Sequence, residues 1–235
     1  MKNKKDCDNK KHIDNKNKII ELFKRTKIKL NSKTDEQKEA LKSIRDNQIT
    51  ILYGLAGTGK THISAMWGLS QLILGKYKQL VLTRPCIEAY GEHVGFLPGT
   101  ADDKIAPYML PLFEIFHNVI DQNMINTLIQ ANIIRTIPLA YQRGLTYHET
   151  IIIADEMENA IPQQVRLLLT RIGRKSKMII TGDTDQSDLI GTNGLEDAIL
   201  KLKEISDIGI VKLTESSIIR NPIIAKIEAA YSVKK

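Results

Sequence analysis

Residues 54–61, Gly-Leu-Ala-Gly-Thr-Gly-Lys-Thr, have the residue types and spacing of a phosphate-binding loop. The glycines let the backbone curl until successive N–H groups face a polyphosphate. Lys60 would then reach the β- and γ-phosphate oxygens, and the Thr61 hydroxyl would ligate Mg²⁺. The alternative, a glycine-rich turn with one exposed lysine, does not explain the apolar run before the loop or the helical pattern after it. We therefore expect a nucleotide to contact Gly54, Leu55, Ala56, Gly57, Thr58, Gly59, Lys60 and Thr61.

Two neighbouring acids, Asp155 and Glu156, end an apolar run that begins at Thr150. Four consecutive apolar residues in that run predict a strand buried on both faces, as in a parallel sheet. Open α/β sheets bind ligands beyond the carboxyl ends of such strands. We expect Asp155 to hold Mg²⁺ and Glu156 to act in catalysis by orienting or polarising the attacking water. The alternative is a pair of exposed loop acids.

Another polar group follows the apolar run at residues 176–181. Thr181, Asp183 and Gln186 are suited to sensing a γ-phosphate, and Gln186 is a catalytic candidate together with Lys60 and Glu156. Because Asp, Gly and Thr also form ordinary turns, a plain turn is the alternative here.

Gln37 lies three residues after Thr34, which is the spacing of a helix capping box. Its position about twelve residues before the strand that leads into the phosphate loop also fits adenine recognition. The residues alone leave both roles open.

The elements that position these residues follow from apolar periodicity and from the breakers between them. Apolar runs predict strands at 49–53, 79–84, 133–140, 150–156, 176–181 and 209–214. Helical spacing predicts helices at 34–45, 60–74, 102–109, 112–121, 124–132, 162–172, 194–204 and 222–231. Their alternation predicts an α/β fold with a mostly parallel sheet and helices on both faces.

Charge is distributed unevenly along the 235 residues. Residues 1–33 carry twelve Lys and Arg against four Asp and Glu, whereas the remainder is close to neutral. We expect residues 1–33 to be a basic, disordered arm and residues 34–235 to be the globular domain. The arm either keeps the protein soluble or recruits nucleic acid through phosphate contacts.

The chain lacks an apolar run of about 18 residues, the length that a membrane span requires. Cys7 and Cys86 are its two cysteines, which is too few for a disulfide framework. We expect both to be free thiols of a cytoplasmic protein that has no membrane partner.

Together the motifs resemble the PhoH family of P-loop ATPases, which is related to the core of superfamily-one helicases. The resemblance spans about residues 34–232. It rests on Gly54–Thr61, Thr83-Arg84-Pro85, Gly95-Phe-Leu-Pro-Gly99 with Lys104 and Pro107-Tyr108, Arg143-Gly144, Asp155-Glu156 with Asn159, Leu169-Thr-Arg-Ile-Gly173, and Ser176 to Gln186 with its Thr-Gly-Asp.

The resemblance implies a RecA-like core that binds ATP, with Gln37 beside the adenine and Arg220 facing a γ-phosphate. It also implies that Thr83 and Arg84 face nucleic acid. Glu158 departs from the pattern, because the family pattern Asp-Glu-x-Gln-Asn has glutamine there.

The function that this implies is Mg²⁺-dependent ATP hydrolysis coupled to binding or remodelling of RNA or single-stranded DNA. One core of about 200 residues offers a single face, so we expect a homo-oligomer, such as a ring, or an ATP-dependent switch that does not translocate. The alternative from another class is a P-loop small-molecule kinase, against which the Thr181–Gln186 motif argues.

Overall fold

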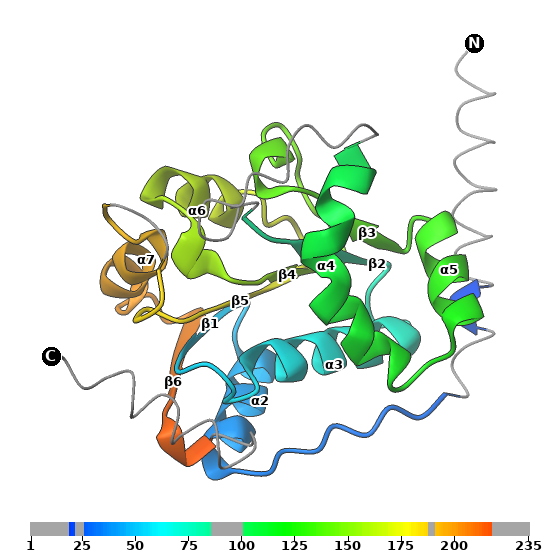
Figure 1. Cartoon of the computed structure of the whole chain (residues 1–235), viewed down its shortest axis with the longest axis horizontal. Helices are drawn as coiled ribbons and strands as arrows, with labels where there is room; N and C mark the ends of the chain where they lie inside the picture. The colour runs from blue at the N-terminus through cyan, green and yellow to red at the C-terminus, as the bar shows by residue number, and fades with distance from the viewer. Residues whose placement is uncertain (1–18, 22–25, 86–100, 188–190, 218–235) are drawn as a thin grey trace, which may run out of the picture.

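The computed structural model describes residues 19–21, 26–85, 101–187 and 191–217. Side chains are described for all of these residues except 101–105 and Glu215. Its centre is a six-stranded, all-parallel sheet in the order β3-β2-β4-β5-β1-β6 (Figure 1). The strands are β1 (Ile49–Gly54), β2 (Gln79–Thr83), β3 (Ile134–Thr136), β4 (Thr150–Ala154), β5 (Lys177–Gly182) and β6 (Ile208–Leu213).

Helices cover both faces of the sheet (Figure 1). On one face lie α2 (Asp35–Asp46), α3 (Lys60–Ile73), α4 (Ala101–His117) and α5 (Gln122–Gln130). On the other lie α6 (Pro162–Leu169) and α7 (Gly194–Leu202). Short 3₁₀ turns occur at Leu139–Tyr141, Met157–Asn159 and Glu215–Ser217. The expected α/β fold with helices on both faces is therefore confirmed.

The strand β4 shows why the sheet is buried on both sides. All five of its residues are buried, and successive side chains point to opposite faces. Ile151 and Ile153 join the apolar cluster under α2 to α5, whereas Ile152 and Ala154 join the cluster under α6 and α7. The unbroken apolar run in the sequence is what a strand between two helical layers requires.

The sequence-based prediction of two helices at 102–109 and 112–121 is wrong, since α4 runs through both Pro107 and Pro111. Proline removes a helix hydrogen bond and usually kinks or ends the helix. Here Met109, Leu112 and Phe116 are fully buried on one side of α4, so packing against the core outweighs that cost.

The strand expected at 133–140 is also too long. β3 contains only Ile134–Thr136 and pairs with β2 alone, at the edge of the sheet. Pro138 has no N–H to donate to a ladder and begins a 3₁₀ turn instead. The helix expected at 222–231, together with Arg220, lies outside the described residues.

Residues from the predicted basic arm contribute to the folded core. Ile20 is 5% exposed, and the partly buried Ile28 and Leu30 pack against the same cluster. The segment before α2 therefore lies along the domain. The division at residue 33 stays a prediction.

The sheet order brings the site together, because β4, β5 and β1 are adjacent. Parallel strands have their carboxyl ends at one edge of the sheet. The phosphate loop, Asp155 and Asp183 follow these three strands directly. None of the described helices is long and apolar enough to cross a membrane.

Candidate active site

The phosphate loop joins β1 to α3 and depends on glycine in two different ways. Gly54 has φ +124°, and a Cβ there would collide with the carbonyl oxygen of Leu213 in β6. Gly59 has φ +91° and is the N-cap of α3. At both positions φ is positive, which residues with a side chain rarely adopt. The glycines in the sequence are therefore what allows the loop to curl.

The Lys60 ammonium lies inside this loop. Its Nζ donates to the carbonyl oxygens of Gly54 at 2.5 Å and Leu55 at 2.8 Å. The residue is 8% exposed. Burial lowers the pKa of Lys60, while Asp183 and Glu156 oppose that shift. The nearby carboxylates thus favour the charged form that phosphate binding requires.

Gln37 supports the loop through its side chain. Its backbone N–H donates to the Thr34 hydroxyl at 3.2 Å, as in a capping box. The side chain does not return to Thr34. Instead Oε1 accepts from the Lys33 N–H at 2.8 Å, and Nε2 donates to the Thr58 carbonyl at 2.9 Å. Adenine recognition by Gln37 stays a prediction.

Asp155 lies just beyond β4 and its side chain is 1% exposed. Its Oδ1 accepts hydrogen bonds from the hydroxyls of Thr61, at 2.8 Å, and Thr181. Its Oδ2 is 3.2 Å from a terminal nitrogen of Arg84. Burial raises the pKa of Asp155, and Arg84 is the largest influence in the opposite direction.

The oxygen atoms of Asp155 and Thr61 are of the kind that bind Mg²⁺. The ion prefers hard oxygen ligands, keeps several waters and usually takes one or two carboxylates together with substrate phosphates. Asp155 and the Thr61 hydroxyl supply such oxygens next to the phosphate loop. Within the described part of the chain, no three His, Cys, Asp or Glu side chains form a cluster that could hold a metal ion. Asp155 and Thr61 are thus the residues whose oxygens fit the ion.

Glu156 adopts a left-handed backbone conformation, with φ 55° and ψ 42°. This is uncommon for residues other than glycine, and such outliers cluster at functional sites. Its side chain is 43% exposed, and its Oε1 accepts a hydrogen bond of 2.7 Å from Arg84. A hydrogen bond with Glu158, followed by the Arg84 charge, lowers the pKa of Glu156.

Glu158 is buried beside Glu156, at 1% exposure. Burial and the neighbouring Glu156 raise the pKa of Glu158 to about 9. Its Oε2 accepts from the Asp183 N–H at 3.0 Å, and a Cβ on Gly182 would collide with this oxygen. These opposite pKa shifts favour an ionised Glu156 beside a protonated Glu158, and a protonated carboxyl group is neutral like a glutamine side chain.

The polar group after β5 lies in the same pocket. Asp183 is 4% exposed, and within the described residues its Oδ2 has no hydrogen-bond partner. Its other oxygen accepts from the Asp185 N–H at 3.1 Å. Gln186 also lines the pocket. Asp183 lines the pocket, and a buried carboxylate oxygen without a partner is suited to bind a cation or a donor group.

One pocket of about 550 Å³ collects many of the sequence-predicted residues, although Gly54, Leu55 and Thr58 of the loop are not among its lining residues. Those that line it are Ala56, Gly57, Gly59, Lys60, Thr61, Asp155, Glu156, Asp183 and Gln186. Gln37 lies behind the loop, and Arg220 lies outside the described residues.

Sequence reasoning did not place Arg84, Pro111 or Ile115 at the nucleotide. Arg84 lines the pocket, although the resemblance implied a position facing nucleic acid. Its signal in the sequence is that Arg84 ends the predicted strand 79–84, whereas the place of β2 beside β4 comes only from the structure. Pro111 and Ile115 of α4 line the pocket too. Only the packing of α4 over α3 places them there.

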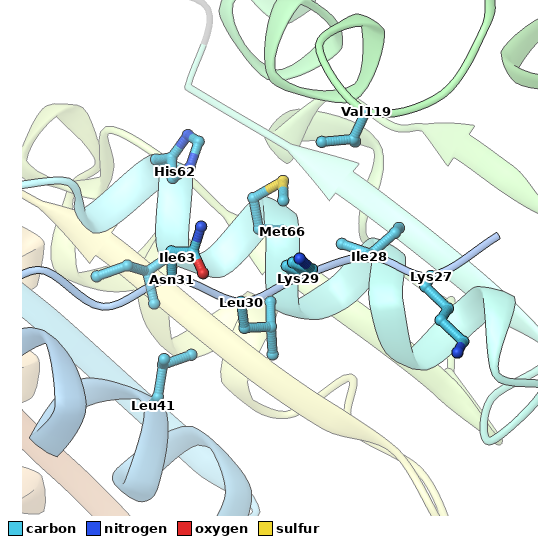
Figure 2. A pocket seen from close by; sticks show the side chains of 10 residues that line it. All are labelled: Lys27, Ile28, Lys29, Leu30, Asn31, Leu41, His62, Ile63, Met66 and Val119. Atoms are coloured by element: carbon cyan, nitrogen blue, oxygen red, sulfur yellow. The ribbon is translucent and has the colours of Figure 1, made fainter.

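A second pocket of about 420 Å³ adjoins the first, because His62 lines both. Figure 2 shows His62 on the first turn of α3, with Met66 further along the helix and Val119 opposite. Burial, and then the Lys33 charge, lower the pKa of His62. The other lining residues come from the extended segment before α2 and from α2 and α3: Lys27, Ile28, Lys29, Leu30, Asn31, Leu41 and Ile63.

A model of the PhoH-like protein family matches residues 29–232. The chain belongs to the PhoH-like family. With the phosphate loop and parallel sheet described above, it is a P-loop NTPase in fold.

Three PhoH relatives show the extent of the similarity. A PhoH-like protein of Bacillus subtilis is 40% identical over 214 residues, which cover 90% of this chain and 67% of the relative. A PhoH-like protein of Mycobacterium tuberculosis is 37% identical, over 91% of this chain and 61% of the relative. Protein PhoH of Escherichia coli is 32% identical, over 86% and 58%. This chain thus corresponds to about three fifths to two thirds of these proteins.

Two helicases are among the solved structures to which the chain is similar. The Pif1 helicase of Candida albicans matches with a TM-score of 0.40 and 18% identity, over 79% of this chain and 40% of that chain. The Hef helicase domain of Pyrococcus furiosus matches with a TM-score of 0.44 and 14% identity, over 75% and 37%.

Proposed function

We propose that this PhoH-like chain hydrolyses ATP with Mg²⁺. The observation that carries the proposal is the hydrogen bond of 2.8 Å between Thr61 and Asp155, with Lys60 and Glu156 lining the same pocket. This combination supplies oxygens for a metal ion, a cation for phosphates and a carboxylate for water. Phosphoryl transfer in P-loop NTPases uses these components.

Each residue has a separate task in this proposal. The loop N–H groups and Lys60 hold the β- and γ-phosphates, and Thr61 and Asp155 hold Mg²⁺. When bound, Mg²⁺ would neutralise part of the negative charge on the phosphate oxygens. Glu156 orients the attacking water and takes part in removing its proton. Asp183 and Gln186 sense whether a γ-phosphate is present.

The second pocket offers room for the base and ribose. His62 connects it to the phosphate pocket, and its walls combine apolar side chains with four polar or charged ones, Lys27, Lys29, Asn31 and His62. Nucleobases have apolar faces and polar edges, so this lining suits them. Gln37 would act on the adenine side by holding the loop through Thr58.

The partner that we propose is RNA or single-stranded DNA. Residues 1–33 carry twelve Lys and Arg against four Asp and Glu, and contacts with phosphates dominate the affinity for nucleic acids. We also propose that chains assemble, since one core offers a single face. Arg220 of one chain would then reach the γ-phosphate bound by its neighbour. Either this assembly remodels nucleic acid, or the chain switches with ATP without translocating.

The test is release of inorganic phosphate from ATP, with Mg²⁺ and with a chelator, by wild type and Lys60→Ala. Wild type should release phosphate only with Mg²⁺, and the variant should lose turnover while its thermal unfolding stays cooperative. Lys203→Ala, which removes an exposed lysine, is the matched control. Hydrolysis by Lys60→Ala at the wild-type rate would refute the proposal, and phosphate transfer to a nucleoside would indicate a kinase.

A further inference from the structure

Arg84 is the one arginine among the described lining residues of the nucleotide pocket. It directly follows β2, and its side chain is 14% exposed. One terminal nitrogen lies 2.7 Å from Oε1 of Glu156 and 3.2 Å from Oδ2 of Asp155. The other donates to the Tyr108 carbonyl of α4 at 2.7 Å. The guanidinium thus joins both acids of the site to α4.

This arrangement engages the group that we assign to the attacking water. Oε1 of Glu156 accepts a hydrogen bond from Arg84. A carboxylate orients a water by accepting its hydrogen bond, and an oxygen bound to a guanidinium is a weaker acceptor. Withdrawal of Arg84 from Glu156 would therefore make the carboxylate a stronger acceptor for that water.

We propose that Arg84 is a catalytic residue that moves from Glu156 to the γ-phosphoryl group of a bound nucleoside triphosphate. The same movement frees Glu156 to accept the attacking water. This inference rests on the proposed ATPase function and adds a cis arginine that responds to the third phosphate.

Electrostatics favours the move. A terminal phosphoryl group carries more negative charge than one carboxylate and presents several oxygens to the planar guanidinium, which binds phosphate bidentately. The guanidinium keeps its charge at any physiological pH. Arg84 and Lys60 line the same pocket, so a phosphate held by the loop would occupy the cavity that the Arg84 side chain borders.

The chemistry balances without a further reactant. The water oxygen forms a bond to the γ-phosphorus while the bond from that phosphorus to the β–γ bridging oxygen breaks. The products are the diphosphate and inorganic phosphate, and the proton of the water leaves through Glu156 to solvent. Arg84 spreads the charge that develops on the γ-phosphoryl oxygens, a contribution that in related systems is worth about 10³–10⁵ in rate.

A purely structural ion pair is the competing explanation. Arg84 would then hold Asp155 and Glu156 in place in every state of the site. The two explanations differ in what the third phosphate does. A structural pair contributes equally to binding of di- and triphosphates, whereas the proposed residue contributes only when a γ-phosphate is present.

The experiment compares wild type, Arg84→Ala and Arg84→Lys in two measurements. Calorimetry with Mg²⁺ gives the affinities for ADP and for a non-hydrolysable ATP analogue, and single-turnover kinetics gives the rate of phosphate release. We expect Arg84→Ala to bind ADP within about threefold of wild type and to lose about tenfold or more in its preference for the triphosphate, since a charge-assisted contact is removed. Its hydrolysis rate should fall about 10³-fold.

The second variant and the control separate this role from folding. Arg84→Lys keeps the charge without the planar fork and should fall between wild type and Arg84→Ala in both measurements. Arg166→Ala, at an exposed position of α6, should behave as wild type. An unchanged triphosphate preference in Arg84→Ala, or hydrolysis as fast as wild type, would overturn the inference and leave the ATPase proposal standing. A wild type that fails to hydrolyse ATP would overturn both.

Discussion

The Thr61 hydroxyl donates a hydrogen bond of 2.8 Å to Oδ1 of Asp155. The two residues lie 94 positions apart, and this bond joins the first turn of α3 to the end of β4. The hydroxyl of Thr181 in β5 donates to the same oxygen. Hydrogen bonds to a single buried carboxylate therefore connect α3, the end of β4 and β5, without any ligand.

Glu156→Gln should keep nucleotide binding and lose hydrolysis. The amide retains the size of the side chain and a hydrogen-bond acceptor, but it cannot take a proton from water. We expect the affinity for Mg²⁺·ATP to stay within about threefold, and the single-turnover rate to fall by about 10²–10⁴. Equilibrium binding and rapid-quench kinetics on the same preparation check this. Loss of binding would show that Glu156 serves the metal or the fold.

Glu158 should make stability depend on alkaline pH. Its pKa is raised to about 9 in the folded protein, so the folded state binds a proton that the unfolded state releases above about pH 4.5. The stabilisation from the protonated form is fully present below that pH and is lost as pH rises through the folded pKa. The free energy of unfolding should therefore decrease between about pH 4.5 and 9, by at most about 1.4 kcal/mol per pH unit for this proton.

Glu158→Gln is the variant that isolates this effect. Its amide can still accept from the Asp183 N–H and donate to Glu156, yet it does not titrate. Urea unfolding of wild type and variant at several pH values from 6 to 9 gives the difference in their free energies of unfolding. The free energy of unfolding of the variant should increase relative to that of wild type as pH rises. A constant difference across that range would mean that Glu158 does not carry the proton.

Gln37→Ala should loosen the phosphate loop. The substitution leaves the Thr58 carbonyl without its donor, and an unsatisfied buried group costs about 1–3 kcal/mol. We expect weaker binding of ATP and of GTP by similar factors, together with a lower unfolding temperature. Gln163→Ala, at an exposed position of α6, is the control. A loss confined to ATP would instead indicate that Gln37 reads the adenine.

Removal of residues 1–18 should weaken binding to single-stranded nucleic acid. This segment carries seven Lys and three Asp, and ends before Ile20 and the other core residues of the N-terminal part. Each lost phosphate contact should reduce the slope of log affinity against log salt by about 0.7. Titrations of fluorescent RNA and DNA oligonucleotides at several salt concentrations measure this slope. ATP hydrolysis without nucleic acid should not change. The same slope before and after truncation would assign the segment to solubility.

The sequence by itself determined those parts of the site that are built from contiguous residues or strand ends. The curl of residues 54–61 needs glycines at fixed positions, so the pattern predicted its geometry locally. Asp155, Glu156 and Asp183 were placed together because parallel strands share one carboxyl edge, a rule that needs only strand assignments. The same reasoning predicted helices on both faces of the sheet.

Only the tertiary structure decided relationships that join distant segments. α4 continues through two prolines because its packing against the core outweighs a local preference. The Gln37 side chain bonds to the phosphate loop, whereas its position in the sequence left a capping box and adenine recognition open. Arg84 turns toward Glu156, and Glu158 is buried against the same carboxylate. The direction of a side chain and the pKa of a buried acid depend on which atoms of other elements surround them, and a sequence pattern does not contain that information.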